Sequence, residues 1–221
     1  MQSCSWEDII PVEETESAVQ FLVETWYLIV QRQPDFIQFK ISEPKLTERL
    51  CFYLRKLQAN SGLTGFWDNE AQYALYDERG ELHDRIRKDI KYSSNKFEQR
   101  LELFFEFKKI RKTTLSAYRG ENGMCRFVDG NYAINAPFAI MIGIIKNEDD
   151  GIINQLYETL INNKLHDTLK MIPNIGGEYV WYPSEVIPGF AKFETQHLRA
   201  PEKAPQKGCI TIAHIILMCH K

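Results

Sequence analysis

Apolar side chains recur along the first half of the chain at two spacings, one typical of helices and one typical of strands. Residues 16–32 form an apolar-rich stretch with its charges near the ends, and residues 45–59 carry apolar side chains at three- and four-residue intervals, which predicts two helices. Pro34 follows the first of them, where a helix end is expected. Strand-like segments separated by polar turns come next and predict antiparallel hairpins. These segments are residues 66–77, 83–92 and 97–110.

The second half of the chain predicts helices and strands in alternation. Helices are expected over residues 113–128 and 151–171, and a loop over residues 174–207, which carry Gly, Pro and mixed charge. Residues 138–146 and 209–219 are nearly continuous apolar runs, as in strands that are covered on both faces. The order of elements predicts the α/β class, with a mixed sheet and helices packed on it.

The length of 221 residues suits one domain of ordinary size. Residues 1–40 are expected to form an N-terminal helical extension that packs on a core of residues 41–221. A composition of 44% hydrophobic and 26% charged residues excludes a disordered or low-complexity chain. No apolar run reaches the roughly 20 residues of a membrane helix, and the five widely spaced cysteines suit reduced thiols. A soluble, cytoplasmic protein without membrane contact is therefore expected.

The charge of the chain is unevenly distributed. The formal net charge is −3, but the segment from Arg85 to Lys112 holds ten Lys and Arg against four Asp and Glu. That segment is therefore +6 and the rest of the chain is −9. A basic segment in an acidic protein is either a solvated surface or the contact area for a polyanion.

The basic segment also carries a group of residues suited to metal chemistry. In residues 101–109, strand alternation places Glu102, Phe104, Glu106 and Lys108 on one face and an apolar row on the other. Asp89 lies in the preceding strand-like segment, so pairing of the two strands would bring Asp89, Glu106 and Lys108 together. Two carboxylates at one point suit a hard divalent cation such as Mg²⁺, and a lysine beside them suits the handling of water or phosphate.

Other interpretations of these residues remain open. An ordinary ion-pair ladder across an exposed strand face would contain the same residue types. A different strand register would bring Glu70 or Glu102 to the cluster instead. A zinc site at the C-terminal end is disfavoured, because alternation separates Cys209 from His214 and the chain has no Cys-x-x-Cys pair.

The residues Thr47-Glu48 on a predicted helix, then Asp89, then Glu106-x-Lys108 on a strand, followed by helix, strand, helix and strand, resemble the PD-(D/E)xK (restriction-endonuclease-like) nuclease superfamily. The resemblance implies a restriction-endonuclease-like core in which Asp89, Glu106 and the backbone carbonyl of Phe107 bind Mg²⁺ (or Mn²⁺). Lys108 would assist the attacking water and Glu48 would support the site. One departure is Lys88, which stands where many members have Pro before the Asp.

Nucleic acid, specifically DNA, is the partner that this resemblance and the basic segment imply. Contacts to phosphate are expected from Arg85, Arg87 and Lys91, and from His197 and Arg199 in the predicted polar loop. For Arg126 and Tyr132 the sequence favours simple packing over a site role, and His214 suits a core position.

The expected function is a metal-dependent nuclease that hydrolyses DNA, with a role in restriction or anti-phage defence. The alternative is a non-catalytic nucleic-acid-binding or assembly subunit that keeps the fold, and a third is an interaction protein whose charged strand face binds no metal. A homo-oligomer or a partner subunit of a defence complex is compatible with each of them.

Overall fold

The computed structural model describes residues 11–69, 72–76, 82–87, 89–96, 100–146, 150–203 and 208–219. For residues 72–76, 82–87, 150 and 163 it describes the backbone alone.

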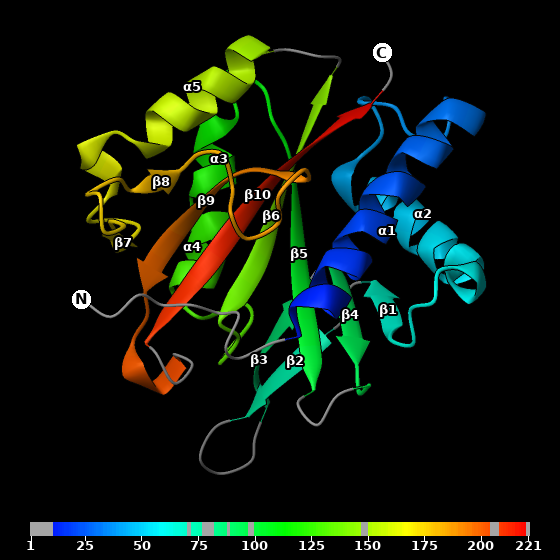
Figure 1. Cartoon of the computed structure of the whole chain (residues 1–221), viewed down its shortest axis with the longest axis horizontal. Coiled ribbons are helices and arrows are strands. Elements are labelled where there is room, and N and C mark those ends of the chain that lie inside the picture. Colours follow the sequence, from blue (N-terminus) through cyan, green and yellow to red (C-terminus); the bar gives the residue numbers. More distant parts are fainter. Residues whose placement is uncertain are drawn as a thin grey trace.

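An eight-stranded mixed sheet lies at the centre of the molecule (Figure 1). In spatial order its strands are β1 (Phe66–Asn69), β4 (Ile90–Ser94), β5 (Leu101–Lys109), β6 (Phe138–Lys146), β10 (Cys209–Cys219), β9 (Ala191–Leu198) and β7 (Met171–Ile172), with β8 (Val180–Trp181) also paired to β9. β5, β6 and β10 are parallel to one another, and the other neighbours pair antiparallel. β2 (Gln72–Tyr76) and β3 (Leu82–Arg87) form a separate hairpin.

Helices cover both faces of this sheet and complete a three-layer arrangement (Figure 1). One face, called here the α1/α2 face, carries α1 (Val12–Arg32) and α2 (Glu43–Leu57). The other, called the α3–α5 face, carries α3 (Leu115–Arg119), α4 (Met124–Val128) and α5 (Asp150–Leu160). Short 3₁₀ turns lie at Gln58–Asn60, Asn163–Leu165 and Pro201–Lys203. The predicted α/β class with a mixed sheet is confirmed.

The strand alternation expected for β5 separates two hydrophobic cores. Leu103, Phe105 and Phe107 are buried in the core under α1 and α2, whereas Phe104 belongs to the core on the α3–α5 face. Successive residues of a strand point to opposite faces. Glu106 therefore points to the α3–α5 face, where its register partner Met141 of β6 also lies.

The N-terminal helix α1 shares the core of the sheet. Ala18, Leu22 and Trp26 have no exposed surface and pack in the same core as α2 and β5. The Trp26 indole Nε1–H donates a hydrogen bond of 2.7 Å to the carbonyl oxygen of Met218 in β10. Nε1 is the one polar atom of the Trp26 side chain, so this bond satisfies its hydrogen-bonding capacity while the apolar ring is buried in the core.

The strand expected over residues 83–92 is divided in the structure, which corrects the sequence prediction. β3 ends at Arg87 and pairs with β2, whereas β4 begins at Ile90 and pairs with β1 and β5. Asp89 lies between the two strands, immediately before β4. Alternation cannot be carried from Arg85 and Arg87 through to Lys91, because the chain changes sheets between them.

The elements after β5 agree with the prediction at the strands and differ at the helices. β6 and β10 have the expected bounds, but residues 113–128 form two short helices instead of one. A Cβ on Gly123 would lie 1.9 Å from the carbonyl oxygen of Tyr118, so only glycine permits the turn between α3 and α4. α5 ends at Leu160, and the segment expected to be a loop over residues 174–207 contains β8 and the eight-residue β9.

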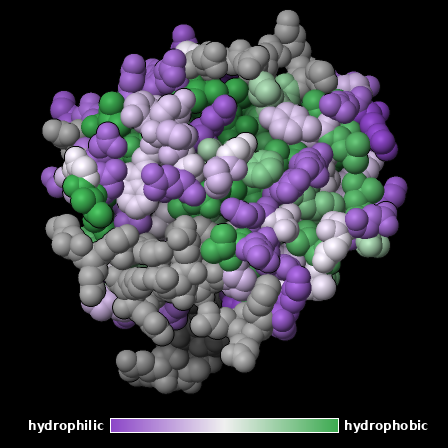
Figure 2. Space-filling view, viewed as in Figure 1, coloured by the Kyte–Doolittle hydropathy of each residue, from purple (hydrophilic) through white to green (hydrophobic). Residues whose placement is uncertain are grey.

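The surface of the described chain mixes polar and apolar side chains. On the face drawn in Figure 2, hydrophilic and hydrophobic residues are interspersed. Within the described residues, no helix combines the length and the apolar character that crossing a membrane requires.

The cysteines differ in state. Cys51, Cys125 and Cys219 are free thiols, whereas Cys209 is disulfide-bonded, which corrects the expectation that every thiol is reduced. Burial raises the pKa of Cys51 and of Cys219 to about 11. These two thiols therefore stay protonated, and weakly reactive, at neutral pH.

A chain of buried hydrogen bonds joins β9 to β10 and α3. His197 Nδ1 lies 2.7 Å from the Leu169 carbonyl and His197 Nε2 lies 2.7 Å from Thr195 Oγ1. His214 Nε2 lies 3.0 Å from the same Thr195 oxygen, and His214 Nδ1 lies 2.9 Å from the Tyr118 hydroxyl. Because a carbonyl only accepts, His197 Nδ1 carries its proton, and one direction of donation then runs from Tyr118 through His214 and Thr195 to His197. Both histidines are neutral in this chain.

His197 and Arg199, expected as exposed contacts to nucleic acid, are interior residues instead. His197 has no exposed surface. The guanidinium of Arg199 donates to backbone carbonyls of α4 and of the segment that follows it, through Nε to Phe127 (2.8 Å), through Nη1 to Ala133 (2.7 Å) and through Nη2 to Tyr132 (3.0 Å). The polar sequence of this region reflects hydrogen bonding inside the protein, and these two residues are unable to reach a phosphate.

The neutral histidines predict acid-sensitive stability. Burial lowers the pKa of His197 to about 4 and places that of His214 well below its ordinary value. Between the unfolded pKa of about 6.5 and the folded one, unfolding takes up a proton, so stability falls as the pH falls. The stability advantage of wild type over His197→Gln should therefore shrink by about 2 kcal/mol between pH 7 and pH 5, as measured by urea unfolding. An advantage that stays constant over this range would show that His197 takes up no proton on unfolding.

Candidate functional site

Asp89, Glu106 and Lys108 converge at the end of β5, as their positions in the sequence suggest. Ile90 is the register partner of Phe105, which places Asp89 beside Glu106 at the start of β4. The Asp89 carboxylate accepts a hydrogen bond of 2.9 Å from the backbone N–H of Phe107. Glu106 Oε1 lies 2.7 Å from Lys108 Nζ.

The Lys108 ammonium group makes three short contacts. Besides Glu106, it donates to Glu43 Oε1 at 2.9 Å and to the backbone carbonyl of Phe107 at 2.9 Å. An ammonium group has three donors, and these three acceptors account for all of them. Lys108 therefore has one fixed position between the end of β5 and the start of α2.

The helix carboxylate at the site is Glu43, whereas Glu48, the residue expected there, is exposed. Glu43 opens α2, where its second oxygen accepts the Lys109 backbone N–H at 2.9 Å. Helical periodicity explains the difference, because Glu43 precedes the buried Leu46 and Leu50 by three and seven residues and shares their face. Glu48 lies two residues from either leucine and points away from the sheet.

Arg126 of α4 is a further member of the site. Its Nη1 lies 3.3 Å from Glu106 Oε1 and donates a hydrogen bond of 2.7 Å to the Tyr132 hydroxyl. The guanidinium also lies over the Tyr132 ring, 4.9 Å from its centroid, so the ring and the hydroxyl together orient it. The sequence favours simple packing for both residues, which the structure corrects. No strand or helix period connects them to Glu106, which lies on another element.

Among the carboxyl and amino groups of this site, Glu106 has the most strongly shifted pKa. It has no exposed surface, and burial together with the negative charge of Asp89 raises its pKa to about 8, although Lys108 and Arg126 oppose the rise. Its Oε1 faces both cations, whereas Oε2 is buried without a hydrogen-bond partner among the described residues. A buried carboxylate oxygen without a partner is costly for a protein and calls for an explanation such as an ion.

The pKa values of Asp89 and Lys108 are raised as well. Burial raises the pKa of Asp89, although Lys108 lowers it in part. For Lys108, burial acts to lower the pKa, but the negative charges of Glu106, Glu43 and Asp89 outweigh it and the pKa rises. Lys108 is therefore cationic, and in this arrangement it acts as a hydrogen-bond donor and not as a base.

These residues are compatible with a hard divalent cation. No group of three His, Cys, Asp or Glu side chains within the described part of the chain is placed to hold a metal. Asp89, the free oxygen of Glu106 and the Phe107 carbonyl nevertheless supply oxygen ligands only. That set suits Mg²⁺, which is usually held by one or two carboxylates and keeps several of its waters.

The expected phosphate contacts on the basic segment are placed differently. Lys91 is buried and its ammonium group pairs with Glu102, which removes it from the surface. The side chains of Arg85 and Arg87, and the whole of Glu70, lie outside the described residues. Glu102 contacts Lys91 and Arg100, and no contact to Glu106 or Lys108 is observed for it.

A set of cations lies instead beside the Glu43 end of the site. Lys109 and Arg111 both lie over the Phe39 ring, at 5.4 Å and 4.8 Å from its centroid. Arg111 and the next residue, Lys112, are exposed. This group, called here the Arg111 strip (Lys109, Arg111 and Lys112), continues directly from Lys108 and offers positive charge to an approaching polyanion.

The pocket of about 790 Å³ between β7, β8 and β9 is not part of this site, since none of its lining residues is Asp89, Glu106, Lys108 or one of their partners Glu43 and Arg126.

No protein-family model, no curated protein and no solved structure matches the chain. The function proposed below therefore depends on the residues of the site themselves.

Proposed function

We propose that this protein is a Mg²⁺-dependent nuclease that hydrolyses phosphodiester bonds of DNA, built on a restriction-endonuclease-like core. The observation that carries the proposal is the convergence of Asp89, Glu106 and Lys108, with a buried Glu106 oxygen that has no partner among the described residues. Paired carboxylates with an adjacent lysine form the arrangement that the resemblance to the PD-(D/E)xK superfamily implies.

Asp89, Glu106 and the carbonyl of Phe107 would hold the cation. When bound, Mg²⁺ polarises a phosphoryl oxygen and lowers the pKa of its water. The raised pKa of Glu106 has a consequence for loading, because the proton on this carboxyl group must leave before the oxygen can serve as a ligand. The positive charge of Lys108 and Arg126 favours the ionised form and so assists this step.

Lys108 would act on the water and the phosphate as a positioned cation. Its contacts to Glu43 and Glu106 fix the ammonium group, and a fixed positive charge costs no reorganisation when negative charge develops. Arg126 reaches the same carboxylate from the α3–α5 face and is partly exposed. It would meet the phosphate from the side opposite to Glu43.

The alternative, a non-catalytic nucleic-acid-binding or assembly subunit, is favoured by one observation. Lys108 and Arg126 both approach Glu106 Oε1 and can neutralise it without any metal. A structural ion-pair network would look similar on the Oε1 side. Such a network leaves Glu106 Oε2 without a partner among the described residues.

Substitution of Lys108 separates chemistry from metal binding. Lys108→Met keeps the aliphatic stem and both carboxylates, so Mn²⁺ binding should persist while plasmid cleavage falls by roughly 10²–10³-fold, the loss expected when one preorganised electrostatic contact to the transition state is removed. Breaking a buried ion pair from one side costs about 3–5 kcal/mol, and in EDTA the variant should lose stability on this order, part of which Mn²⁺ restores. Calorimetric Mn²⁺ titration, a nicking assay and urea unfolding measure these three quantities.

Two control variants show whether the effects are specific to Lys108. Lys164→Met changes an exposed lysine outside both the site and the Arg111 strip and should leave cleavage within about twofold of wild type, since surface substitutions have small effects. Glu106→Gln should lose Mn²⁺ binding and cleavage together. Wild-type cleavage by Lys108→Met would contradict the assignment of Lys108, and Mn²⁺ binding by Glu106→Gln would contradict the metal site.

Metal binding should release a proton from Glu106. Because its pKa is about 8 without metal, Mn²⁺ binding at pH 7 should release about one proton per ion, and the number should fall toward zero near pH 9. Calorimetric titrations in buffers of different ionisation enthalpy measure this number directly. Binding at pH 7 with no proton released would show that Glu106 is not the ligand.

The Arg111 strip should carry nucleic-acid binding. Arg111→Gln with Lys112→Gln removes two exposed charges and should flatten the slope of log affinity against log salt by about 2 for duplex DNA, since each phosphate contact releases counterions. Fluorescence anisotropy in EDTA measures binding without cleavage. The matched control, Lys164→Gln with Lys192→Gln, removes two exposed charges elsewhere and should leave the slope unchanged. Equal slopes for the two double variants would exclude the strip as the binding surface.

A further inference from the structure

The pocket between β7, β8 and β9 lies on the opposite face of the sheet from Glu106. Ile172 and Trp181 are the register partners of Gln196 and Glu194, and strand alternation places these residues on the α1/α2 face. Glu106 lies on the α3–α5 face, with β6 and β10 between its strand and β9. A ligand in this pocket is therefore separate from one at the candidate catalytic site.

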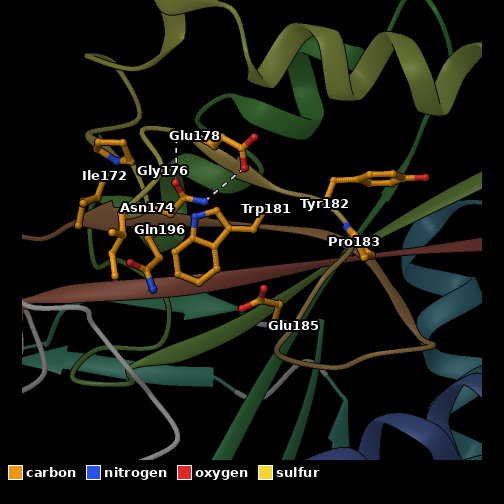
Figure 3. A pocket seen from close by; sticks show the side chains of 11 residues that line it. Ile172, Asn174, Gly176, Glu178, Trp181, Tyr182, Pro183, Glu185 and Gln196 are labelled. Atoms are coloured by element: carbon orange, nitrogen blue, oxygen red, sulfur yellow. Dashed lines mark hydrogen bonds between the residues drawn. The ribbon is translucent and has the colours of Figure 1, made fainter.

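The two walls of this pocket are fixed by hydrogen bonds within the protein. On one wall, the Asn174 side chain accepts the backbone N–H of Glu178 at 2.9 Å and donates to the Glu178 carboxylate at 3.4 Å (Figure 3). On the other, buried Glu194 accepts the Ser184 hydroxyl at 2.7 Å and the backbone N–H of Val186 at 3.0 Å. A pocket with walls fixed in this way needs little ordering when a ligand binds.

Trp181 gives the pocket a hydrogen-bond donor without an acceptor. Figure 3 shows its indole ring between Asn174 and Glu185. The indole Nε1 is buried and has no hydrogen-bond partner among the described residues. Indole nitrogen donates only, so the ligand that satisfies it must present an acceptor such as a peptide carbonyl.

The charge of the pocket is negative. The carboxylates of Glu178 and Glu185 are exposed at its rim, and no lysine or arginine is among the described lining residues. Two carboxylates without a cation repel phosphate, which argues against a nucleotide. Ile175, which is 99% exposed, and the face of Trp181 add apolar surface of the kind that covers the aliphatic stem of a lysine or arginine.

We propose that this pocket binds a basic segment of a partner protein. A lysine or arginine side chain of that segment pairs with Glu178 and Glu185, its aliphatic stem packs on Ile175 and Trp181, and a neighbouring backbone carbonyl accepts the Trp181 indole N–H. The pocket volume of about 790 Å³ accommodates one such side chain with its flanking backbone. The proposal is independent of nuclease activity, because the two sites lie on opposite faces of the sheet.

A capped peptide, acetyl-Ala-Lys-Ala-Lys-Ala-amide, tests this proposal against its glutamate counterpart. The readout is the indole N–H signal of Trp181 in the NMR spectrum, assigned as the signal that disappears in Trp181→Phe. The lysine peptide should shift this signal in a saturable and salt-sensitive manner, and the glutamate peptide should not. Glu178→Gln with Glu185→Gln should weaken binding about tenfold, the combined effect expected of two solvent-accessible ion pairs.

Two controls separate the pocket from general charge and from the catalytic site. Glu121→Gln with Glu202→Gln removes two exposed carboxylates elsewhere and should leave peptide binding unchanged. Glu106→Gln, which disables the proposed nuclease site, should also bind the peptide as wild type does. Absence of binding, or equal binding by the two double glutamate variants, would overturn the proposal. A single-stranded oligonucleotide that shifts the Trp181 signal in place of the lysine peptide would overturn it in favour of a nucleotide pocket.

Discussion

The burial of one carboxylate, Glu106, constrains the arrangement of everything around it. A carboxylate inside a protein is stable only with compensating charge and hydrogen bonds, and here the compensation comes from three directions. Lys108 lies two residues further along the same strand, Arg126 reaches across from α4, and the start of α2 supplies Glu43 to balance the lysine. The end of β5, the first turn of α2 and the short helix α4 are therefore linked through one carboxylate.

The part of this arrangement that follows from local periodicity could be predicted from the sequence. Alternation along β5 placed Glu106 and Lys108 on one face correctly, and the continuous apolar runs identified β6 and β10 with their bounds. Glu43 was missed because the predicted helix began two residues too late, at 45, which left this residue outside the helical face. The pairing of Asp89 with the site was anticipated, but from a continuous strand that the structure divides.

The part that depends on contacts between distant segments could not be predicted. β9 reads as a loop because its sequence mixes charged and polar residues, yet Glu194, Gln196 and His197 are all buried. Each has a hydrogen-bond partner from another segment, as His197 has in the Leu169 carbonyl. Propensity and hydropathy describe a residue by its own chemistry, and they carry no information about a partner that folding brings to it.

The buried guanidinium of Arg199 restricts what can replace it. Its bonds hold the carbonyls of Phe127, Tyr132 and Ala133, and this segment carries the Tyr132 ring against which Arg126 rests. Lysine has the same charge, but its donors radiate from a single nitrogen and lack the planar spread of the guanidinium, whose three nitrogens reach separate carbonyls. A conservative exchange of Arg199 for lysine would therefore disturb Arg126. Through Arg126 it would change the ionisation of Glu106, although residue 199 contacts neither side chain.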